Sequence, residues 1–173
     1  MPDAAVVDCG LAKGVRLERP LLREIRRSLH RADALAAAGR TLKRRDASRR
    51  RVAERLARAG VAPAAREEAL TALESAGVLD DERFARSRAE ALADRGWGDR
   101  AIHAKLSAEG VEATAAAAAI EALEPEAERA ATVASRFSDA RKAWAYLARH
   151  GFDRDSVEAA LGALDAPERA GLG

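Results

Sequence analysis

The 173-residue sequence contains a single cysteine, Cys9, only six aromatic residues, and no apolar run near the length of a membrane helix. One cysteine excludes an intramolecular disulfide framework and a cysteine-based zinc site. A membrane helix needs about 20 consecutive apolar residues, and the N-terminus lacks the pattern of a signal peptide. We therefore expect a cytoplasmic protein with no membrane span, no metal and no other cofactor.

Residues that favour β-strands are also scarce. The chain has nine valines and three isoleucines, whereas 45 of its residues are alanine. Alanine, leucine, arginine and glutamate dominate, and these residues have high helix propensity. Because alanine buries little apolar area, the larger apolar residues are too few for a thick sheet-based core. The composition predicts an all-α protein whose thin helices approach one another closely.

The net charge of +2 hides a difference between the two ends of the chain. Residues 1–60 carry a net charge of +9, and residues 61–173 carry −7. Such an asymmetry is typical of a protein that contacts nucleic acid or an acidic surface through its basic end.

Three segments of 22 residues align without a gap, at 52–73, 102–123 and 143–164. Each segment predicts a helix, a glycine stop and a second helix, because the glycine falls where a helix end favours the left-handed conformation. The matching positions are Leu56, Leu106 and Leu147; Gly60, Gly110 and Gly151; Val61, Val111 and Phe152; Leu70, Ile120 and Leu161; and Leu73, Leu123 and Leu164. Chance recurrence of a leucine–glycine spacing does not explain five such positions.

A further helix is expected before each aligned pair, at 31–45, 80–95 and 125–137. The N-cap candidates for the helices that follow are Ser48, Asp99, and either Ser138 or Asp139. The predicted fold is three tandem three-helix repeats. One repeat looks too small to bury its own core, so we expect the repeats to stack into an elongated, curved molecule.

The repeats define the predicted domains. Residues 1–30 form an N-terminal tail with room for a short helix at 21–30, and 166–173 form a C-terminal tail. The basic first repeat spans 31–76, the second 77–124 and the third 125–165.

Several motifs in these repeats resemble those of the RecX family, the bacterial regulators of the RecA recombinase. The middle repeat opens with Leu-Asp-Asp-Glu-Arg-Phe-Ala at 79–85, and a helix after Gly98 ends in a Leu-x-x-x-Gly-Val pattern. A Tyr-Leu-x-x-x-Gly-Phe element follows at 146–152, and Arg45, Ser48 and Arg49 match the first repeat. The family-motif residues are Asp80, Asp81, Phe84, Gly98, Leu106, Gly110, Tyr146, Gly151 and Phe152.

The resemblance covers residues 31–165 and implies a non-enzymatic regulator. Such a protein binds the RecA–DNA filament and limits filament growth, strand exchange, ATP hydrolysis and co-protease activity, and so acts in recombination, DNA repair and the SOS response. Its implied partners are the RecA filament and single- or double-stranded DNA, with weak DNA binding on its own, and a monomer is expected. The alternatives are a stand-alone nucleic-acid-binding helical-repeat protein and a helical scaffold for another partner.

The residues themselves give one strong functional signal, which is basic. Nine lysines and arginines lie between Arg40 and Arg58, against only Asp46 and Glu54. The candidate filament- or DNA-binding residues are Lys43, Arg44, Arg45, Arg49, Arg50, Arg51, Arg55 and Arg58. Contacts from such residues to phosphates release counterions, so binding should depend steeply on salt. The alternative is an ordinary solvated helix face.

No catalytic constellation is evident. The three histidines lie far apart in sequence, no Walker-type glycine loop occurs, and Asp80, Asp81 and Glu82 suit the start of a helix better than a metal. Among the aromatic residues, Phe84, Phe152 and Trp144 fall on apolar stripes and are expected in the core. Trp97, between two glycines, is the residue expected at the surface.

Overall fold

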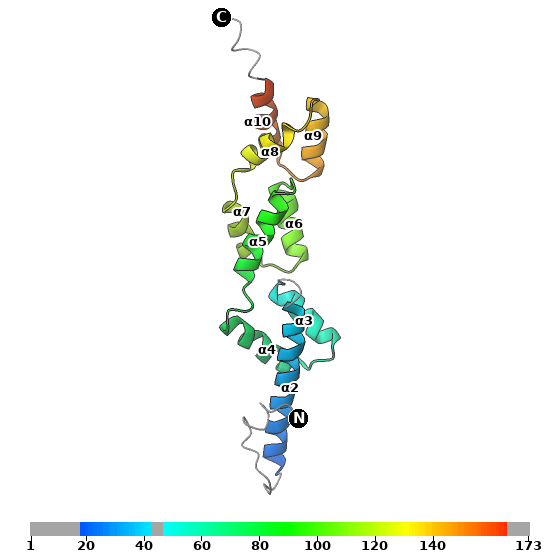
Figure 1. Cartoon of the computed structure of the whole chain (residues 1–173), viewed down its shortest axis with the longest axis vertical. Helices are drawn as coiled ribbons and strands as arrows, with labels where there is room; N and C mark the ends of the chain where they lie inside the picture. Colours follow the sequence, from blue (N-terminus) through cyan, green and yellow to red (C-terminus); the bar gives the residue numbers. More distant parts are fainter. Residues whose placement is uncertain (1–17, 43–46, 166–173) are drawn as a thin grey trace, which may run out of the picture. The chain divides into compact units, whose positions relative to one another are not determined.

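The computed structural model describes residues 18–42 and 47–165, and these fold into helices without any strand (Figure 1). The helices are α2 (Arg19–Leu42), α3 (Arg49–Arg58), α4 (Pro63–Ser75), α5 (Asp81–Ala93), α6 (Asp99–Ala108), α7 (Ala113–Glu121), α8 (Glu126–Ala134), α9 (Ala140–Arg149) and α10 (Arg154–Asp165). None of these helices is long and apolar enough to cross a membrane. The predicted all-α class is confirmed.

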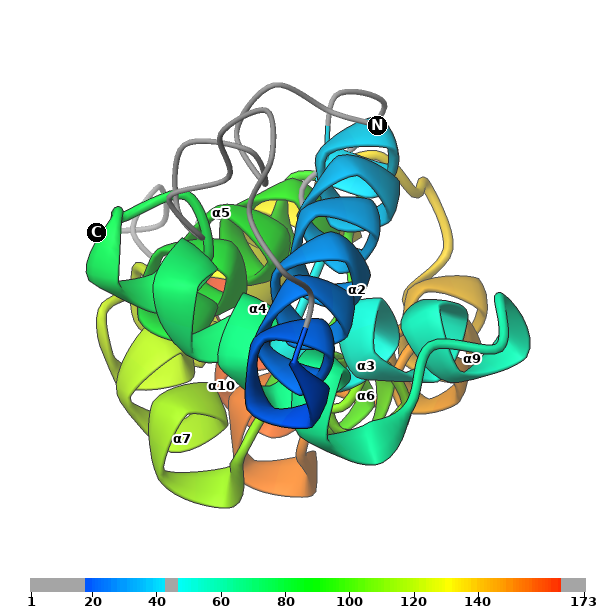
Figure 2. The ribbon, with the colours of Figure 1, turned by 90° about the horizontal axis from the view of Figure 1, so that it is seen from below.

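The chain divides into two compact units, Met1–Asp80 and Asp81–Gly173. The N-terminal unit holds one three-helix repeat, α2 to α4, and the C-terminal unit holds two, α5 to α7 and α8 to α10. In all three repeats the first helix packs most extensively against the third. Within the C-terminal unit, α6 and α9 lie on one side and α7 and α10 on the other (Figure 2).

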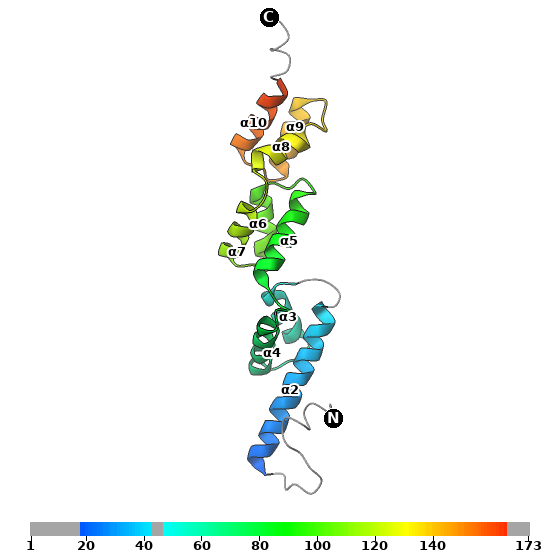
Figure 3. The same ribbon diagram turned by 60° about the vertical axis from the view of Figure 1, so that its left-hand side comes forward.

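The first helix of the N-terminal unit is longer than the sequence suggests. α2 runs without a break for 24 residues, so it joins the stretch 21–30 to the described part of the stretch 31–45, although the two were expected to be separate. Pro20 lies in its first turn, where a missing N–H costs little, and Gly39 is tolerated inside the helix. The N-terminal half of α2 extends past α3 and α4 (Figure 3).

The three aligned glycines end their helices in the predicted way. Gly60, Gly110 and Gly151 have φ values of 79°, 87° and 82°, in the left-handed region. In each case the next residue donates its N–H back to the carbonyl of the aligned leucine, as Val61 does to Leu56 at 3.0 Å and Val111 to Leu106 at 3.1 Å. The same bond pattern at all three glycines confirms the repeat at the level of the backbone.

Each repeat has its own apolar cluster, so the expectation that one repeat cannot bury a core is wrong. In the middle repeat, Leu92, Ile102 and Leu106 pack with buried alanines of α5 and α7. Separate clusters form around Leu56 in the first repeat and around Leu147 in the third. Small side chains let the first and third helices approach closely, so the few leucines suffice to fill the space between three helices.

The predicted helix caps are correct at two of three sites. Ser48 is fully buried and accepts a bond from the Arg51 N–H at 3.3 Å, and Asp139 accepts one from the Lys142 N–H at 3.1 Å. Asp99 is not the cap of α6, which is Gly98. The backbone N–H of Asp99 instead donates to the Glu126 carboxylate at 2.6 Å, so a side chain from the next repeat replaces the local cap.

Candidate nucleic-acid interface

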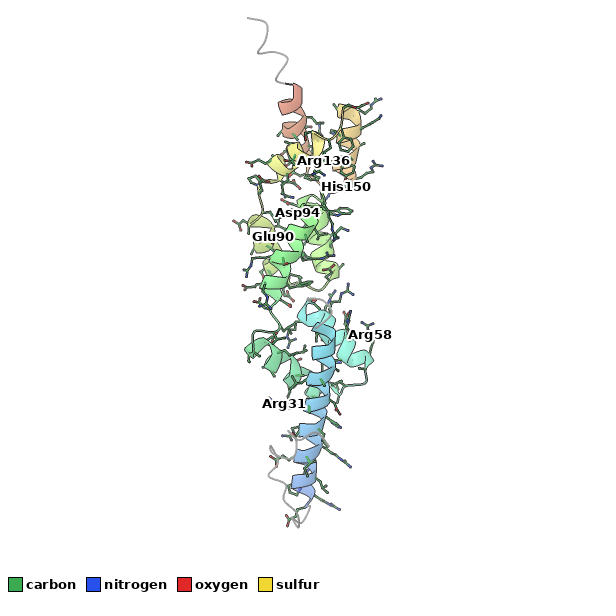
Figure 4. The ribbon with its side chains drawn as sticks, in the orientation of Figure 1. Arg31, Arg58, Glu90, Asp94, Arg136 and His150 are labelled. Atoms are coloured by element: carbon green, nitrogen blue, oxygen red, sulfur yellow. The ribbon has the colours of Figure 1, made fainter. Side chains whose placement is uncertain are left out.

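The basic segment of the sequence forms α3. Its apolar residues Val52 and Leu56 are buried in the repeat, which turns the arginines on the rest of the helix outward. Arg51, Arg55 and Arg58 are all exposed and follow one another at spacings of four and three residues, so they share one face. Arg58 points away from the helices in Figure 4. Three predicted contact residues therefore form a continuous basic face, which we call the α3 face.

The acid in α3 lies close to this face without neutralising it. Glu54 forms an exposed ion pair with Arg50, at 3.6 Å between Nε and Oε1. The Nε of Arg58 donates to the backbone carbonyl of Glu54 at 3.4 Å. An exposed i,i+4 pair contributes only a few tenths of a kcal/mol, so the pairing is easily exchanged for a phosphate.

Arg49 has a different environment from the α3 face. Its guanidinium donates to Glu67 and, at 2.8 Å, to Glu74, both on α4. The hydrogen bond with Glu67 is the main cause that raises the pKa of Arg49, and the charge of Glu74 adds to it. Arg49 thus holds the start of α3 against α4. The predicted contacts Lys43, Arg44 and Arg45 lie outside the described residues.

The family-motif glycines bring the second and third repeats together. Gly98 donates its N–H to the carbonyl of His150 at 3.0 Å, so α6 begins where α9 ends. A Cβ on Gly98 would collide with the backbone of Phe152, and one on Gly151 would collide with Ala101. Only glycine at both positions permits this approach of the two backbones.

A buried carboxylate completes the same junction. Glu126, at the start of α8, is 9% exposed and accepts from the Asp99 N–H at 2.6 Å and from the Asp153 N–H at 3.1 Å. It therefore satisfies backbone donors at the starts of both α6 and α10, where a negative charge is favourable. Burial, followed by the side-chain hydrogen bond between the carboxyl groups of Glu126 and Asp153, raises the pKa of Glu126, and that side-chain hydrogen bond lowers the pKa of Asp153.

Arg129 provides the positive charge at this junction. It is 8% exposed, pairs with the carboxylate of Asp99, and donates to the backbone carbonyls of Glu124 at 2.8 Å and Trp97 at 3.1 Å. Sequence reasoning missed both Arg129 and Glu126, because on an isolated α8 they look like ordinary solvated charges. No spacing rule signals that the neighbouring repeat covers them.

Aromatic rings line one side of the junction. His150 stacks on Tyr146 with ring centroids 3.7 Å apart and contacts Trp97 at 4.7 Å, and the Lys105 ammonium lies 3.9 Å from the centre of Trp97. His150 lies between the helices of the two repeats in Figure 4. Tyr146 also contacts Phe137 at 5.2 Å. This row of rings is built from both repeats.

The expectation for Trp144 is wrong, and the expectation for Trp97 holds only in part. Trp97 is half-buried and packs against the core of the second repeat, because the turn between its flanking glycines folds it back over Lys105. Trp144 is 47% exposed, although it follows the buried Ala143. Of the phenylalanines expected in the core, Phe152 is buried in the third repeat, and Phe84 is partly buried against the core of the second repeat.

The remaining family-motif residues serve the fold. Leu106 is fully buried, Gly110 ends α6, and α5 begins at Asp81, directly after Asp80. Asp81 thus lies in the first turn of α5, where an acid suits the helix dipole. Within the described ranges, no three histidines, cysteines or acids lie close enough together to hold a metal ion.

Comparison with known proteins identifies this arrangement. The family model "RecX, second three-helix domain" matches residues 80–120. The regulatory protein RecX of Stenotrophomonas maltophilia strain K279a is 35% identical over 129 residues, which are 69% of this chain and 79% of that protein. The regulatory protein RecX of Halorhodospira halophila is 34% identical over 145 residues, which are 78% of this chain and 90% of that protein.

Solved structures agree on the fold. The crystal structure of RecX from Lactobacillus salivarius has a TM-score of 0.73 at 19% identity, and covers 79% of this chain and 97% of that chain. A further crystal structure of regulatory protein RecX has a TM-score of 0.77 at 18% identity, and covers 89% and 84%. The repeats and their relatives define a regulatory protein made of three-helix modules. The chain belongs to the RecX family.

Proposed function

We propose that this RecX-family protein regulates a RecA recombinase by binding its nucleoprotein filament. Binding limits filament growth, strand exchange, ATP hydrolysis and co-protease activity, without chemistry by the chain itself. The protein acts as a monomer in the cytoplasm. The support is the match of the middle repeat to the family model and the length of chain shared with the curated relatives.

The α3 face is the structural feature that supports the proposed mode of binding. Arg51, Arg55 and Arg58 present three exposed cations on one side of a helix whose other side is fixed in the core. Such an array suits the regularly spaced phosphates of filament DNA, because each contact releases condensed counterions. Arg49 is not part of the proposed contact, since Glu67 and Glu74 hold it in place.

Inhibition of strand exchange tests the proposal. The protein is titrated into a reaction with RecA, single-stranded circular DNA and a homologous linear duplex. We expect inhibition at well below one protein per RecA, because blocking filament growth at one point affects many subunits. If no inhibition occurs even at one protein per RecA, the proposed function is wrong.

Charge reversal tests the binding mode separately. The triple variant R51E/R55E/R58E should lose most inhibition and most filament association in co-sedimentation. The matched control is R86E/R95E/R154E, which makes the same change in net charge at exposed positions of the C-terminal unit. Equal loss in both variants would contradict a specific role for the α3 face.

The alternative, a stand-alone nucleic-acid-binding protein, predicts tight binding to bare DNA. Fluorescence anisotropy with labelled DNA, with and without RecA, separates the two functions. Association that requires RecA rejects the alternative. Equally tight association without RecA, together with no effect on strand exchange, supports it.

A further inference from the structure

Ile25 of α2 is buried without belonging to the core of any repeat. Its side chain is 8% exposed. Every other valine, leucine, isoleucine or phenylalanine that is buried within the described ranges belongs to one of the three apolar clusters, whereas Ile25 belongs to none of them. The clusters that account for the rest of the large buried side chains therefore do not account for this one.

The position of Ile25 on α2 explains why it is separate from the first repeat's core. Ala34 and Ala38 are fully buried and mark the side of α2 that faces α3 and α4. Ile25 precedes Ala34 by nine residues, which in an α-helix is about 14 Å along the axis and about half a turn around it. This half of α2 extends past the other two helices of the repeat (Figure 3). Ile25 thus lies beyond the core and on the opposite side of α2.

Two leucines line the same side of α2 as Ile25. Leu22 precedes it by three residues and Leu29 follows it by four, so the three side chains form one stripe along the helix. We call these three residues the α2 stripe. Leu22 is 42% exposed, which shows that the neighbours on the helix do not by themselves hide a large apolar side chain there. A part of the chain outside α2 therefore covers Ile25.

The sequence indicates which part of the chain this is. Outside the described ranges, residues 43–46 read Lys-Arg-Arg-Asp and contain no apolar side chain, and residues 166–173 belong to the other compact unit. Residues 1–17 join the first turn of α2 through Glu18. Their larger aliphatic residues are Val6, Val7, Leu11, Val15 and Leu17. Only this segment combines apolar side chains with direct attachment to the correct end of α2.

The length of residues 1–17 is sufficient for this contact. Ile25 lies about 10 Å along the helix axis from Glu18. Leu11 precedes Glu18 by seven residues, which span up to about 23 Å when extended, so the segment can reverse direction and still reach Ile25. Gly14 lies between them, where a residue without a Cβ makes a chain reversal easier.

We propose that residues 1–17 fold back along α2 and cover the α2 stripe, chiefly with Val6, Val7 and Leu11. Burial of apolar area drives the contact, and attachment to α2 gives the segment a high effective concentration at the stripe. The contact also covers an apolar patch that would otherwise favour self-association. The partner of this surface is thus the chain's own N-terminal segment, and neither RecA nor nucleic acid takes part.

The single cysteine of the chain allows a direct test, because Cys9 lies within the segment. A second cysteine is introduced into the full-length protein, either in the stripe by Leu22→Cys or at the next residue by Arg23→Cys. Arg23 is exposed and lies about 160° around the helix from Ile25. Under mild oxidation, Leu22→Cys should form an intramolecular disulfide with Cys9 at least about tenfold faster than Arg23→Cys.

The two positions are matched controls for each other. They are adjacent in sequence, so a segment without a fixed position would reach both at the same rate, and equal rates would overturn the proposal. A second copy of the chain is the other possible occupant. Covalent dimers on a non-reducing gel, formed by Leu22→Cys in preference to the intramolecular disulfide, would show that a second copy covers the stripe and would also overturn the proposal.

A second test changes the segment in the Leu22→Cys protein. V6D/V7D/L11D should slow disulfide formation to the rate of Arg23→Cys, because burial of unpaired carboxylates is unfavourable. The control A4D/A5D/A12D adds the same charge at nearby alanines and should keep the fast rate. Circular dichroism checks that every variant keeps its helices. Equal slowing by both triple variants, or no slowing by V6D/V7D/L11D, would contradict the proposed contact.

Discussion

Gly98 and Phe152 come so close that a single added methyl group at Gly98 would overlap the backbone of Phe152. The Gly98 N–H also donates to the carbonyl of His150, two residues before Phe152. Two repeats of the C-terminal unit are thus joined through main-chain atoms. The contact depends on the absence of a side chain, which is why mutation of this glycine is a sensitive probe of the junction.

Gly98→Ala should therefore destabilise the C-terminal unit. The methyl group cannot be accommodated by rotating a side chain, because it meets backbone, and we expect a loss of about 2–3 kcal/mol in the free energy of unfolding. Urea unfolding followed by circular dichroism measures it. Gly162→Ala is the control, since a Cβ there meets nothing within 4 Å. It should stabilise α10 by about 0.5–1 kcal/mol. Similar changes in both variants would refute the close contact.

Glu126→Gln should weaken the same junction. The carboxylate accepts one backbone N–H on each oxygen, whereas the amide keeps one acceptor and turns an NH₂ group toward the other N–H. Leaving a buried donor unsatisfied costs about 1–3 kcal/mol. Glu128→Gln, at an exposed position in the first turn of the same helix, is the matched control and should change little. Comparable losses in the two variants would show that Glu126 acts only as a surface charge.

The difference in the free energy of unfolding between the native protein and Glu126→Gln should change with pH in a definite direction. Burial, and then the side-chain hydrogen bond with the carboxyl group of Asp153, raise the pKa of Glu126 above its ordinary value of 4.5. The folded protein then binds the proton of the Glu126 carboxyl group more tightly than the unfolded chain does. The stability that results from this tighter binding is fully present below pH 4.5, and it is lost as the pH rises through the raised pKa. The advantage of the native protein over Glu126→Gln should shrink with rising pH in that window. Urea titrations of both proteins at successive pH values measure it, and a widening advantage would contradict the raised pKa.

Arg88 and Glu109 should be energetically coupled within the second repeat. Their side chains form three hydrogen bonds of 2.6 to 3.1 Å between α5 and the end of α6, and the Glu109 contact raises the pKa of Arg88. A double-mutant cycle with Arg88→Ala and Glu109→Ala should give a coupling of about 1 kcal/mol. The exposed pair Arg154–Glu158 is the control and should show no resolvable coupling. Equal coupling energies for the two pairs would show that partial burial does not strengthen the interaction between Arg88 and Glu109.

Local backbone rules explain what the sequence could predict. A glycine four residues after a buried leucine ends a helix because few other residues adopt a positive φ, and this holds at Gly60, Gly110 and Gly151 regardless of the rest of the fold. The buried leucines followed from the same alignment. The strong helix propensity of the composition fixed the fold class for the same reason, since it depends on each residue separately.

The missed features depend on contacts between elements far apart in sequence. Helical periodicity gives the direction of a side chain around its own helix, and Trp144 lies at the edge of the apolar side of α9, where only the neighbouring elements decide whether it is covered. Glu126 and Arg129 are similar, because their burial arises where two repeats meet. The exposure of the arginines in the α3 face was predictable from their helical spacing, whereas the ion pairs of Arg49 with α4 were not.

Arg49 should therefore have a structural role and Arg55 a binding role. Arg49→Ala removes two partly exposed ion pairs to α4 and should lower the free energy of unfolding by about 1 kcal/mol, with little effect on how DNA binding depends on salt. Arg55→Ala should leave stability nearly unchanged and, if Arg55 neutralises one phosphate, reduce the slope of log affinity against log salt by about 0.7 on a single strand. Anisotropy between about 50 and 200 mM salt measures the slope. A reduced slope for Arg49→Ala and an unchanged one for Arg55→Ala would contradict the assignment of the α3 face.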